Sequence, residues 1–138
     1  MKSTFNKNQI ISLIENAEKI PEAVFDFLAK NCTDNGVLSI AKLDQYQLAS
    51  YDAVWTKSQL LAARQITEYA ERVGGNLEKD LALFYTADVL QELSGKFVQH
   101  MASLKLTHEL MSKAIWSEQA MGFVGSVITP ENIDRMAR

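Results

Sequence analysis

Hydrophobic residues recur at helical spacing along most of this 138-residue chain. In the longest such stretch, residues 44–73, apolar positions lie three or four residues apart, which predicts an amphipathic helix with that side in the core. Gly74 and Gly75 then stop the helix and allow the chain to reverse. A second helix, over residues 77–104, is expected to fold back against the first. The expected core positions are Leu48, Tyr51, Trp55, Ala62, Ile66, Tyr69 and Val73 in the first helix, and Leu77, Leu81, Phe84, Ala87, Leu90, Phe97, Met101 and Leu104 in the second.

Further helices are expected on both sides of this hairpin. Asn6 and Gln9 have the spacing of a capping box, which begins a first helix. Pro21 then either ends that helix or begins the next one, because proline suits a first helical turn. Thr107 is a further expected N-cap. A last short helix is predicted from Thr129 onward, where proline and glutamate follow the threonine.

These patterns predict an all-α fold, an antiparallel helical bundle of four main helices plus short ones. It is built on the long helical hairpin of about 44–73 and 77–104, and residues 1–138 are expected to form a single domain.

Several local features carry their own expectations. Asp44 is the expected N-cap of the long helix, with Gln47 in the capping-box position, and Asn76 is the expected cap of its partner. Gly95 interrupts the second helix, which is interpreted as close approach of a neighbouring helix, with a kink in the helix as the alternative. The helix after Thr107 is expected to end near its glycines, Gly122 and Gly125.

Residues 31–36 alternate polar side chains and end in Gly36, a faint likeness to a calcium-binding loop. Such a loop needs a bidentate glutamate at its twelfth position, where this chain has Lys42. A plain turn is therefore the favoured interpretation. Residues 37–41 are left open between a short extended piece and an early helical turn.

Composition and charge narrow the function classes. The formal net charge is −3 and the 14 lysines and arginines form no cluster, which argues against binding to nucleic acid. No run of 18 apolar residues occurs, so no membrane span is predicted. The single cysteine, Cys32, cannot form an internal disulfide. No nucleophile motif surrounds it, so it is expected to be a small core residue beside a turn. A cytoplasmic setting is the expectation.

Candidate chemistry is sparse. His100 and His108 lie about 12 Å apart along a helix, too far to share a metal ion, and are expected to be partly exposed. Asp88 and Glu92 are interpreted as a solvated helix face. The methionines are interpreted as fillers of core gaps. No catalytic residue and no metal ligand is predicted, and cofactor-binding residues remain unknown.

Two consecutive segments resemble a known family. YDAVWTKSQLLAARQITEYAERVGG and NLEKDLALFYTADVLQELSGKFVQHM are similar to the C-terminal helical domain of acyl-CoA dehydrogenases, including the small-residue segment Ala62-Ala63-Arg64. The resemblance implies a larger flavoprotein that holds FAD and acyl-CoA between this bundle and other domains. Two departures weaken it: residues 101–107 lack the glycines that approach FAD, and no glutamate matches the catalytic base.

The leading expectation is therefore a non-catalytic C-terminal all-α domain of an FAD oxidoreductase, the C-terminal part of a longer chain. It would pack on the catalytic core and support homo-oligomer assembly, so its partners would be the rest of its own polypeptide or identical subunits. FAD is expected only in the full-length protein, and this chain alone is predicted to be inactive. The alternative is a freestanding helical adaptor that binds a protein partner. An independent small enzyme is disfavoured, because no nucleophile–base pair or metal set is visible.

Overall fold

The structure, a computed structural model, describes residues 4–137 and confirms the all-α helical bundle. A very short hairpin is the one interruption of the helical order within those residues. The elements in chain order are α1 (Lys7–Asn31), β1 (Thr33–Asp34), β2 (Val37–Leu38), α2 (Ile40–Asp44), α3 (Gln47–Val73), α4 (Asn76–Lys96), the 3-10 turn η1 (Val98–His100), α5 (Met101–Leu104), α6 (His108–Ala114), α7 (Glu118–Val127) and α8 (Pro130–Met136).

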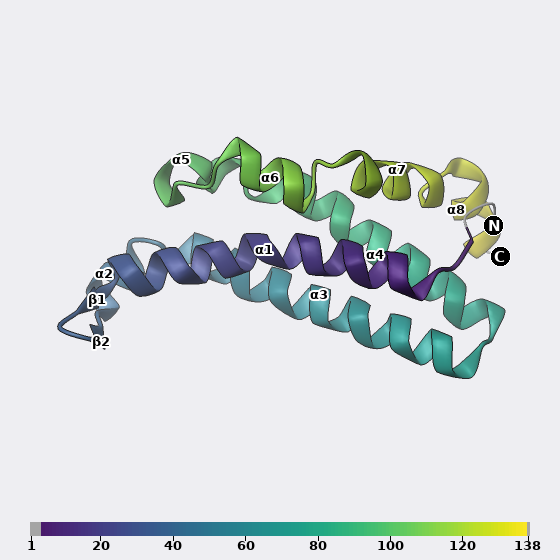
Figure 1. Cartoon of the computed structure of the whole chain (residues 1–138), viewed down its shortest axis with the longest axis horizontal. Helices are drawn as coiled ribbons and strands as arrows, with labels where there is room; N and C mark the ends of the chain where they lie inside the picture. Colours follow the sequence, from purple (N-terminus) through teal and green to yellow (C-terminus); the bar gives the residue numbers. More distant parts are fainter. Residues whose placement is uncertain (1–3, 138) are drawn as a thin grey trace.

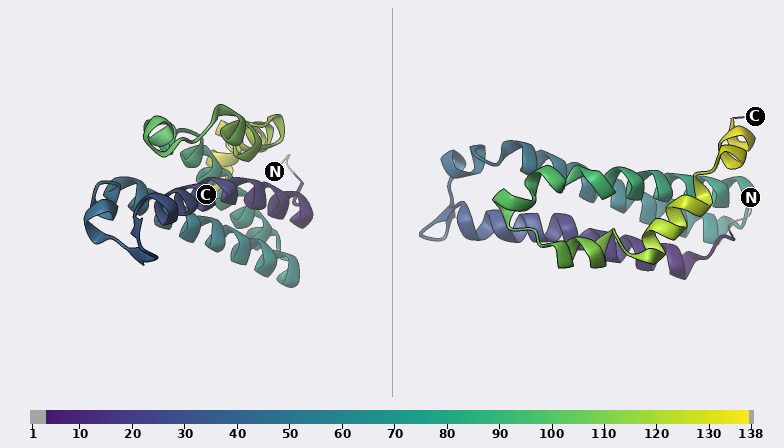
Figure 2. Two further views of the ribbon diagram at one scale, coloured as in Figure 1. Left: turned by 60° about the vertical axis from the view of Figure 1, so that its left-hand side comes forward. Right: turned by 90° about the horizontal axis from the view of Figure 1, so that it is seen from above.

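The long helices α1, α3 and α4 lie side by side along the long axis of the molecule, and successive ones run in opposite directions (Figure 1). The shorter helices then return along the bundle, where α6 packs on α1 and α7 packs on α4. Both ends of the described chain lie at the same end of the bundle, close to the turn between α3 and α4 (Figures 1 and 2). Among residues 4–137, no helix combines the length and apolar character needed to cross a membrane.

Helix α1 begins as predicted, but it does not stop at Pro21. The side chain of Asn6 accepts a hydrogen bond from the Gln9 amide at 3.1 Å. Pro21 lies inside one continuous helix, which corrects the expectation of a boundary there. Buried apolar residues, from Ile10 to Leu28, lie on both sides of the proline. Their packing against the rest of the bundle outweighs the cost of the missing backbone hydrogen bond.

The polar loop after α1 is a tight β-hairpin. Asn35 and Gly36 occupy the two turn positions with φ of 52° and 79°, the left-handed conformations that a type I′ hairpin turn requires. Lys42 forms an ion pair with Asp34 at the place where a calcium loop would need a glutamate. The predicted plain turn is therefore correct, and Cys32 beside it is fully buried as expected.

The long helix begins later than predicted. Ser39 caps the separate helix α2, and Asp44 is the last residue of α2, so its assignment as the N-cap of the long helix is wrong. α3 begins at Gln47 without a side-chain cap. The ring of Tyr46 packs edge-on against Phe27 of α1, with centroids 5.4 Å apart, and this contact anchors the turn between α2 and α3.

The reversal at the double glycine is confirmed, whereas the partner helix is shorter than expected. Gly74 closes α3 with φ of 77°, and Gly75 precedes α4. Asn76 is the first residue of α4 and makes no side-chain cap, contrary to prediction. α4 ends at Lys96 and the buried Phe97 follows, so the predicted helix over residues 77–104 is in fact α4, η1 and α5.

The glycines of the second half do not act as predicted. A Cβ atom on Gly95 would have open space around it, so no neighbouring helix approaches closely there. Gly122 and Gly125 lie inside α7 rather than at its end. The actual break comes earlier, between α6 and α7, where the Trp116 indole donates a hydrogen bond to the Ser94 carbonyl at 2.8 Å. Thr107 and Thr129 cap α6 and α8 as expected.

Candidate interaction surface

Helix α3 turns its small residues, rather than its large ones, toward the core. The expectation that the Trp55 and Tyr69 side of the helix is buried is therefore wrong. Alanine and threonine side chains let α3 pack closely against both α1 and α4, because they place few atoms between the helix axes. The buried positions are Ala49, Asp52, Ala53, Thr56, Leu60, Ala63, Thr67 and Ala70.

The large apolar side chains of α3 project away from the bundle instead. Trp55 is 50% exposed and Tyr51 is 64% exposed, values far above those of any core residue. We call this set the α3 face. It consists of Leu48, Tyr51, Val54, Trp55, Leu61, Tyr69 and Val73.

The α3 face carries no charge along its middle. Between Trp55 and Tyr69, the intervening positions along the middle of this side are Ser58, Ala62 and Gln65, with Leu61 beside them. A surface of large apolar and small uncharged residues matches the composition of protein–protein interface cores, which are depleted in charge and rich in aromatic residues.

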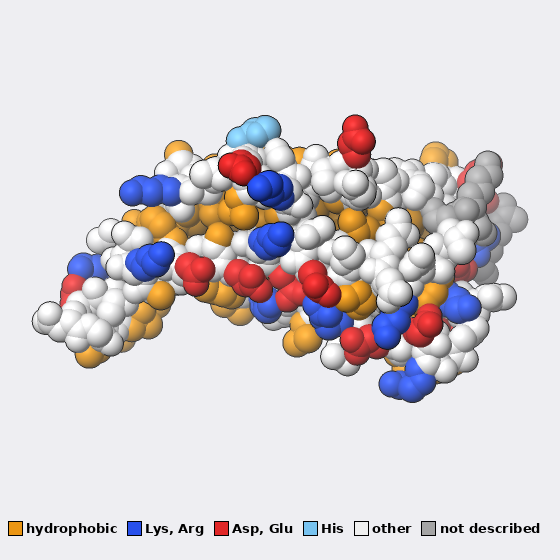
Figure 3. All heavy atoms as spheres, viewed as in Figure 1, with side chains coloured by type: hydrophobic (Ala, Val, Ile, Leu, Met, Phe, Trp, Pro, Cys, Tyr) orange, Lys and Arg blue, Asp and Glu red, His pale blue; other side chains and the backbone are white. Residues whose placement is uncertain are grey.

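Lys57 and Arg64 of α3 lie on its other flank, against α1, whereas the Arg72 guanidinium lies over the Tyr69 ring, 5.4 Å from its centroid. Arg64 contacts Glu18 with a nitrogen–oxygen distance of 2.7 Å, and Lys57 bonds the other carboxylate oxygen of Glu18. Burial raises the pKa of Glu18, but hydrogen bonds and charges from Lys57 and Arg64 outweigh it and hold the pKa below its usual range. Figure 3 shows the row of acidic and basic side chains over α1 and the adjoining part of α3.

Grooves extend the α3 face onto α4. A groove of about 400 Å³ lies between the C-terminal half of α3 and the start of α4. A second groove of about 410 Å³ lies between α4 and the C-terminal helices, and Leu81 and Tyr85 line both. Burial, followed by the nearby charges of Asp88 and Glu92, raises the pKa of Tyr85, so its hydroxyl stays protonated. The other lining residues are Gln65, Ile66, Tyr69 and Glu78 in the first groove and Phe84, Asp88, Gln91, Ile128 and Ile133 in the second.

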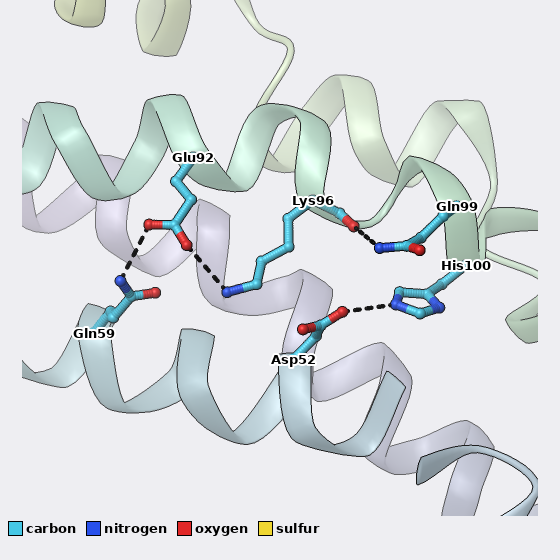
Figure 4. Close-up of polar contacts among 6 residues, drawn as sticks. All are labelled: Asp52, Gln59, Glu92, Lys96, Gln99 and His100. Carbon is cyan, nitrogen blue, oxygen red and sulfur yellow. Dashed lines mark hydrogen bonds and ion pairs between the residues drawn. The ribbon is translucent and has the colours of Figure 1, made fainter. Parts of the chain in front are cut away.

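We call the contact between α3 and α4 the α3–α4 seam. It is polar at the end away from the turn at Gly74 and Gly75. Gln59 of α3 donates to Glu92 of α4 at 3.3 Å, and Lys96 bonds the other oxygen of Glu92 at 3.2 Å (Figure 4). One turn further along, the His100 ring meets Asp52 at 2.8 Å. These contacts join α3 to the end of α4 and to η1 in one orientation, because hydrogen bonds fix direction in a way that apolar packing does not.

The Asp52–His100 pair is the most deeply buried polar contact of the seam. Both residues are 7% exposed, which corrects the expectation of a partly exposed His100. Asp52 could orient the imidazole as in a catalytic dyad, yet the neighbouring Ser103 hydroxyl donates to the His100 backbone carbonyl rather than to the ring. The pair thus links α3 to η1 through a buried hydrogen bond. His108, by contrast, is exposed, and its ring lies at a tilt of 56° to the Trp116 ring, with 5.3 Å between centroids.

Neither groove has a lining that suits FAD. Both grooves are lined by an acidic residue, Glu78 or Asp88, and by no lysine or arginine, so they would repel the FAD diphosphate. Residues 101–107, where the family resemblance would place the flavin approach, form α5 and a turn at Lys105. Within residues 4–137, no cluster of three or more histidine, cysteine or acidic side chains is arranged to hold a metal ion.

Sequence reasoning missed the α3 face because it assigned the largest residues to the core. A signal for the correct answer was present. The small residues Ala49, Ala53, Thr56, Ala63, Thr67 and Ala70, together with Leu60, follow one another in steps of four and three, which is the spacing of a continuous helix–helix contact.

Comparison of the chain with protein-family models, with curated proteins and with solved structures finds no match. The resemblance to acyl-CoA dehydrogenases therefore stays a prediction that rests on the sequence of the α3–α4 hairpin.

Proposed function

We propose that this protein is a helical interaction module that docks another protein surface on the α3 face. The observation that carries the proposal is the placement of side chains on α3, with alanine and threonine inside and tryptophan, tyrosine and leucine outside. Apolar surface left in water is unfavourable, so a long helix with its largest residues outward is suited to burial against a second surface.

The extent of the exposed surface supports docking. The α3 face and the adjoining Leu77 and Leu81 of α4 present nine large apolar side chains, each 47% to 64% exposed. At about 100 Å² for each half-exposed large side chain, they present roughly 900 Å², whereas the largest apolar patch on a typical monomer is about 300–600 Å².

The residue types support the same conclusion. Trp55, Tyr51 and Tyr69 supply large, rigid contact area, and tryptophan and tyrosine are enriched among the residues that dominate interface energies. Their polar atoms remain free to bond a partner or water at the rim.

Site-specific photo-crosslinking tests the proposal. Trp55 is replaced by a benzophenone amino acid in the full-length natural protein, and the matched control carries the same group at Gln119, an exposed position on α7. Position 55 should give discrete crosslinked products that disappear when Tyr69→Glu is added. Equal crosslinking from both positions, or no product from position 55, would refute the proposal.

The dehydrogenase interpretation is a second proposal. It is supported by the antiparallel α3–α4 hairpin with its reversal at Gly74 and Gly75, the segment on which the resemblance rests. In that case the α3 face is where the catalytic core packs, and any flavin is held by other parts of the chain. A full-length natural protein that is yellow and reduces a dye with an acyl-CoA would support this proposal, and a colourless, inactive one would refute it.

A further inference from the structure

The exposed residues of α3 are arranged symmetrically about Ala62. Trp55 precedes Ala62 by seven residues and Tyr69 follows it by seven, so each lies two turns, or about 10 Å, from it along the axis. Tyr51 and Val73 lie eleven residues away on either side, about 16 Å along the axis. All of these positions fall on the same side of the helix, because seven and eleven residues are close to whole numbers of turns.

We infer that the partner of the α3 face is a second copy of this chain, bound antiparallel across a two-fold axis at Ala62. This inference rests on the proposed docking role of the α3 face. In a two-fold pair, a residue at a given distance before the axis meets the residue at the same distance after it. Trp55 of each copy then faces Tyr69 of the other, and Tyr51 faces Val73.

The centre of the face suits this close approach. Ala62 is partly exposed and small, and the exposed Ser58 one turn earlier is also small, so two helix axes can come near each other at this point. The aromatic residues on either side then fill the wider space away from the axis. No charged side chain of α3 lies between Trp55 and Tyr69 on this side, so pairing buries no like charges against each other.

The area available is that of a stable dimer. The nine large side chains of the α3 face and its α4 extension present roughly 900 Å² per copy, against about 800 Å² per partner in an ordinary stable interface. The first groove, between α3 and α4, borders Tyr69, so it receives the Trp55 ring of the second copy beside Tyr69.

Cysteine crosslinking tests the geometry. The natural Cys32 is fully buried, so an introduced thiol is the reactive one. Ala62→Cys places identical thiols across the axis and should give a disulfide dimer at least ten times faster than Gln119→Cys on α7. Mixing Ser58→Cys with Ile66→Cys should crosslink the two variants, because each position lies one turn from the axis, while Ser58→Cys alone should crosslink slowly.

Light scattering of the unmodified protein supplies the second measurement. The expected mass is twice 15.5 kDa at tens of micromolar chain, and Trp55→Glu should give a monomer with unchanged helical circular dichroism. A monomeric wild type at 100 μM, or equal crosslinking rates at positions 62 and 119, overturns the inference. Fast self-crosslinking of Ser58→Cys would show a parallel pair and also overturn it. A monomer whose position 55 crosslinks to a different protein refutes self-association while the interaction module stands.

Discussion

The side of α3 that faces the core can be tested by comparing two side-chain truncations on this helix. Trp55 and Leu60 lie five residues apart on α3, yet Trp55 is 50% exposed and Leu60 is fully buried. Trp55→Ala removes the larger side chain, whereas Leu60→Ala removes the buried one. Residue size alone predicts that Trp55→Ala is the more damaging change, and burial predicts the reverse order.

The expected magnitudes follow from the surroundings of each residue. Truncating a fully buried leucine costs about 2–5 kcal/mol, since it loses its transfer free energy and leaves a cavity between α3 and its neighbours. Trp55 has no closed cavity to leave, because half of its surface is already in water. Its loss from the monomer should therefore cost less than about 1 kcal/mol, close to the range of surface substitutions.

Urea unfolding followed by far-UV circular dichroism measures both free energies. The chain is held at a low concentration at which it is monomeric, so that the loss of any association does not enter the comparison. Trp116 remains in both variants as a fluorescence probe, and an unchanged denaturant slope shows that both unfold as the wild type does. A cost for Trp55→Ala equal to or above that for Leu60→Ala would refute this assignment of the core face.

Three further predictions concern other parts of the bundle. Gly95→Ala should raise the free energy of unfolding by about 1 kcal/mol in a urea titration, because a Cβ atom there meets open space inside a helix. Asp52→Ala and His100→Ala should each cost about 3 kcal/mol by leaving a buried polar partner unpaired. Their double variant should cost about 1–3 kcal/mol less than the sum, and simple additivity would show that the two side chains do not interact. The pKa of Glu18 lies below its ordinary value of 4.5 in the folded state, so its stabilising effect is complete above pH 4.5 and is lost as the pH falls through the folded pKa. Glu18→Gln should therefore reduce the fall in the free energy of unfolding as the pH drops below 4.5. Urea titrations at several pH values measure this fall, and a fall as steep as in the wild type would contradict the pairing of Glu18 with Lys57 and Arg64.

Much of the secondary structure could be predicted from local chemistry. Asn6, Thr107 and Thr129 cap helices where their spacing predicted, because capping involves residues only three positions apart. The reversal at Gly74 is likewise a local property of a residue that accepts positive φ. Pro21 was misjudged for a tertiary reason, since packing on both sides of it holds α1 in one piece.

The sequence by itself determined the helical class, several helix starts and the hairpin reversal, because these depend on contacts a few residues apart. Only the tertiary structure decided which side of α3 is inside. That helix carries two stripes of residues at helical spacing, one of large side chains around Trp55 and one of small side chains around Ala63. Both have the same periodicity, so periodicity does not decide which stripe is buried. The small stripe is buried because it lets α3 pack closely against α1 and α4 together. The large stripe was left to the surface, where it forms the face on which the proposed function rests.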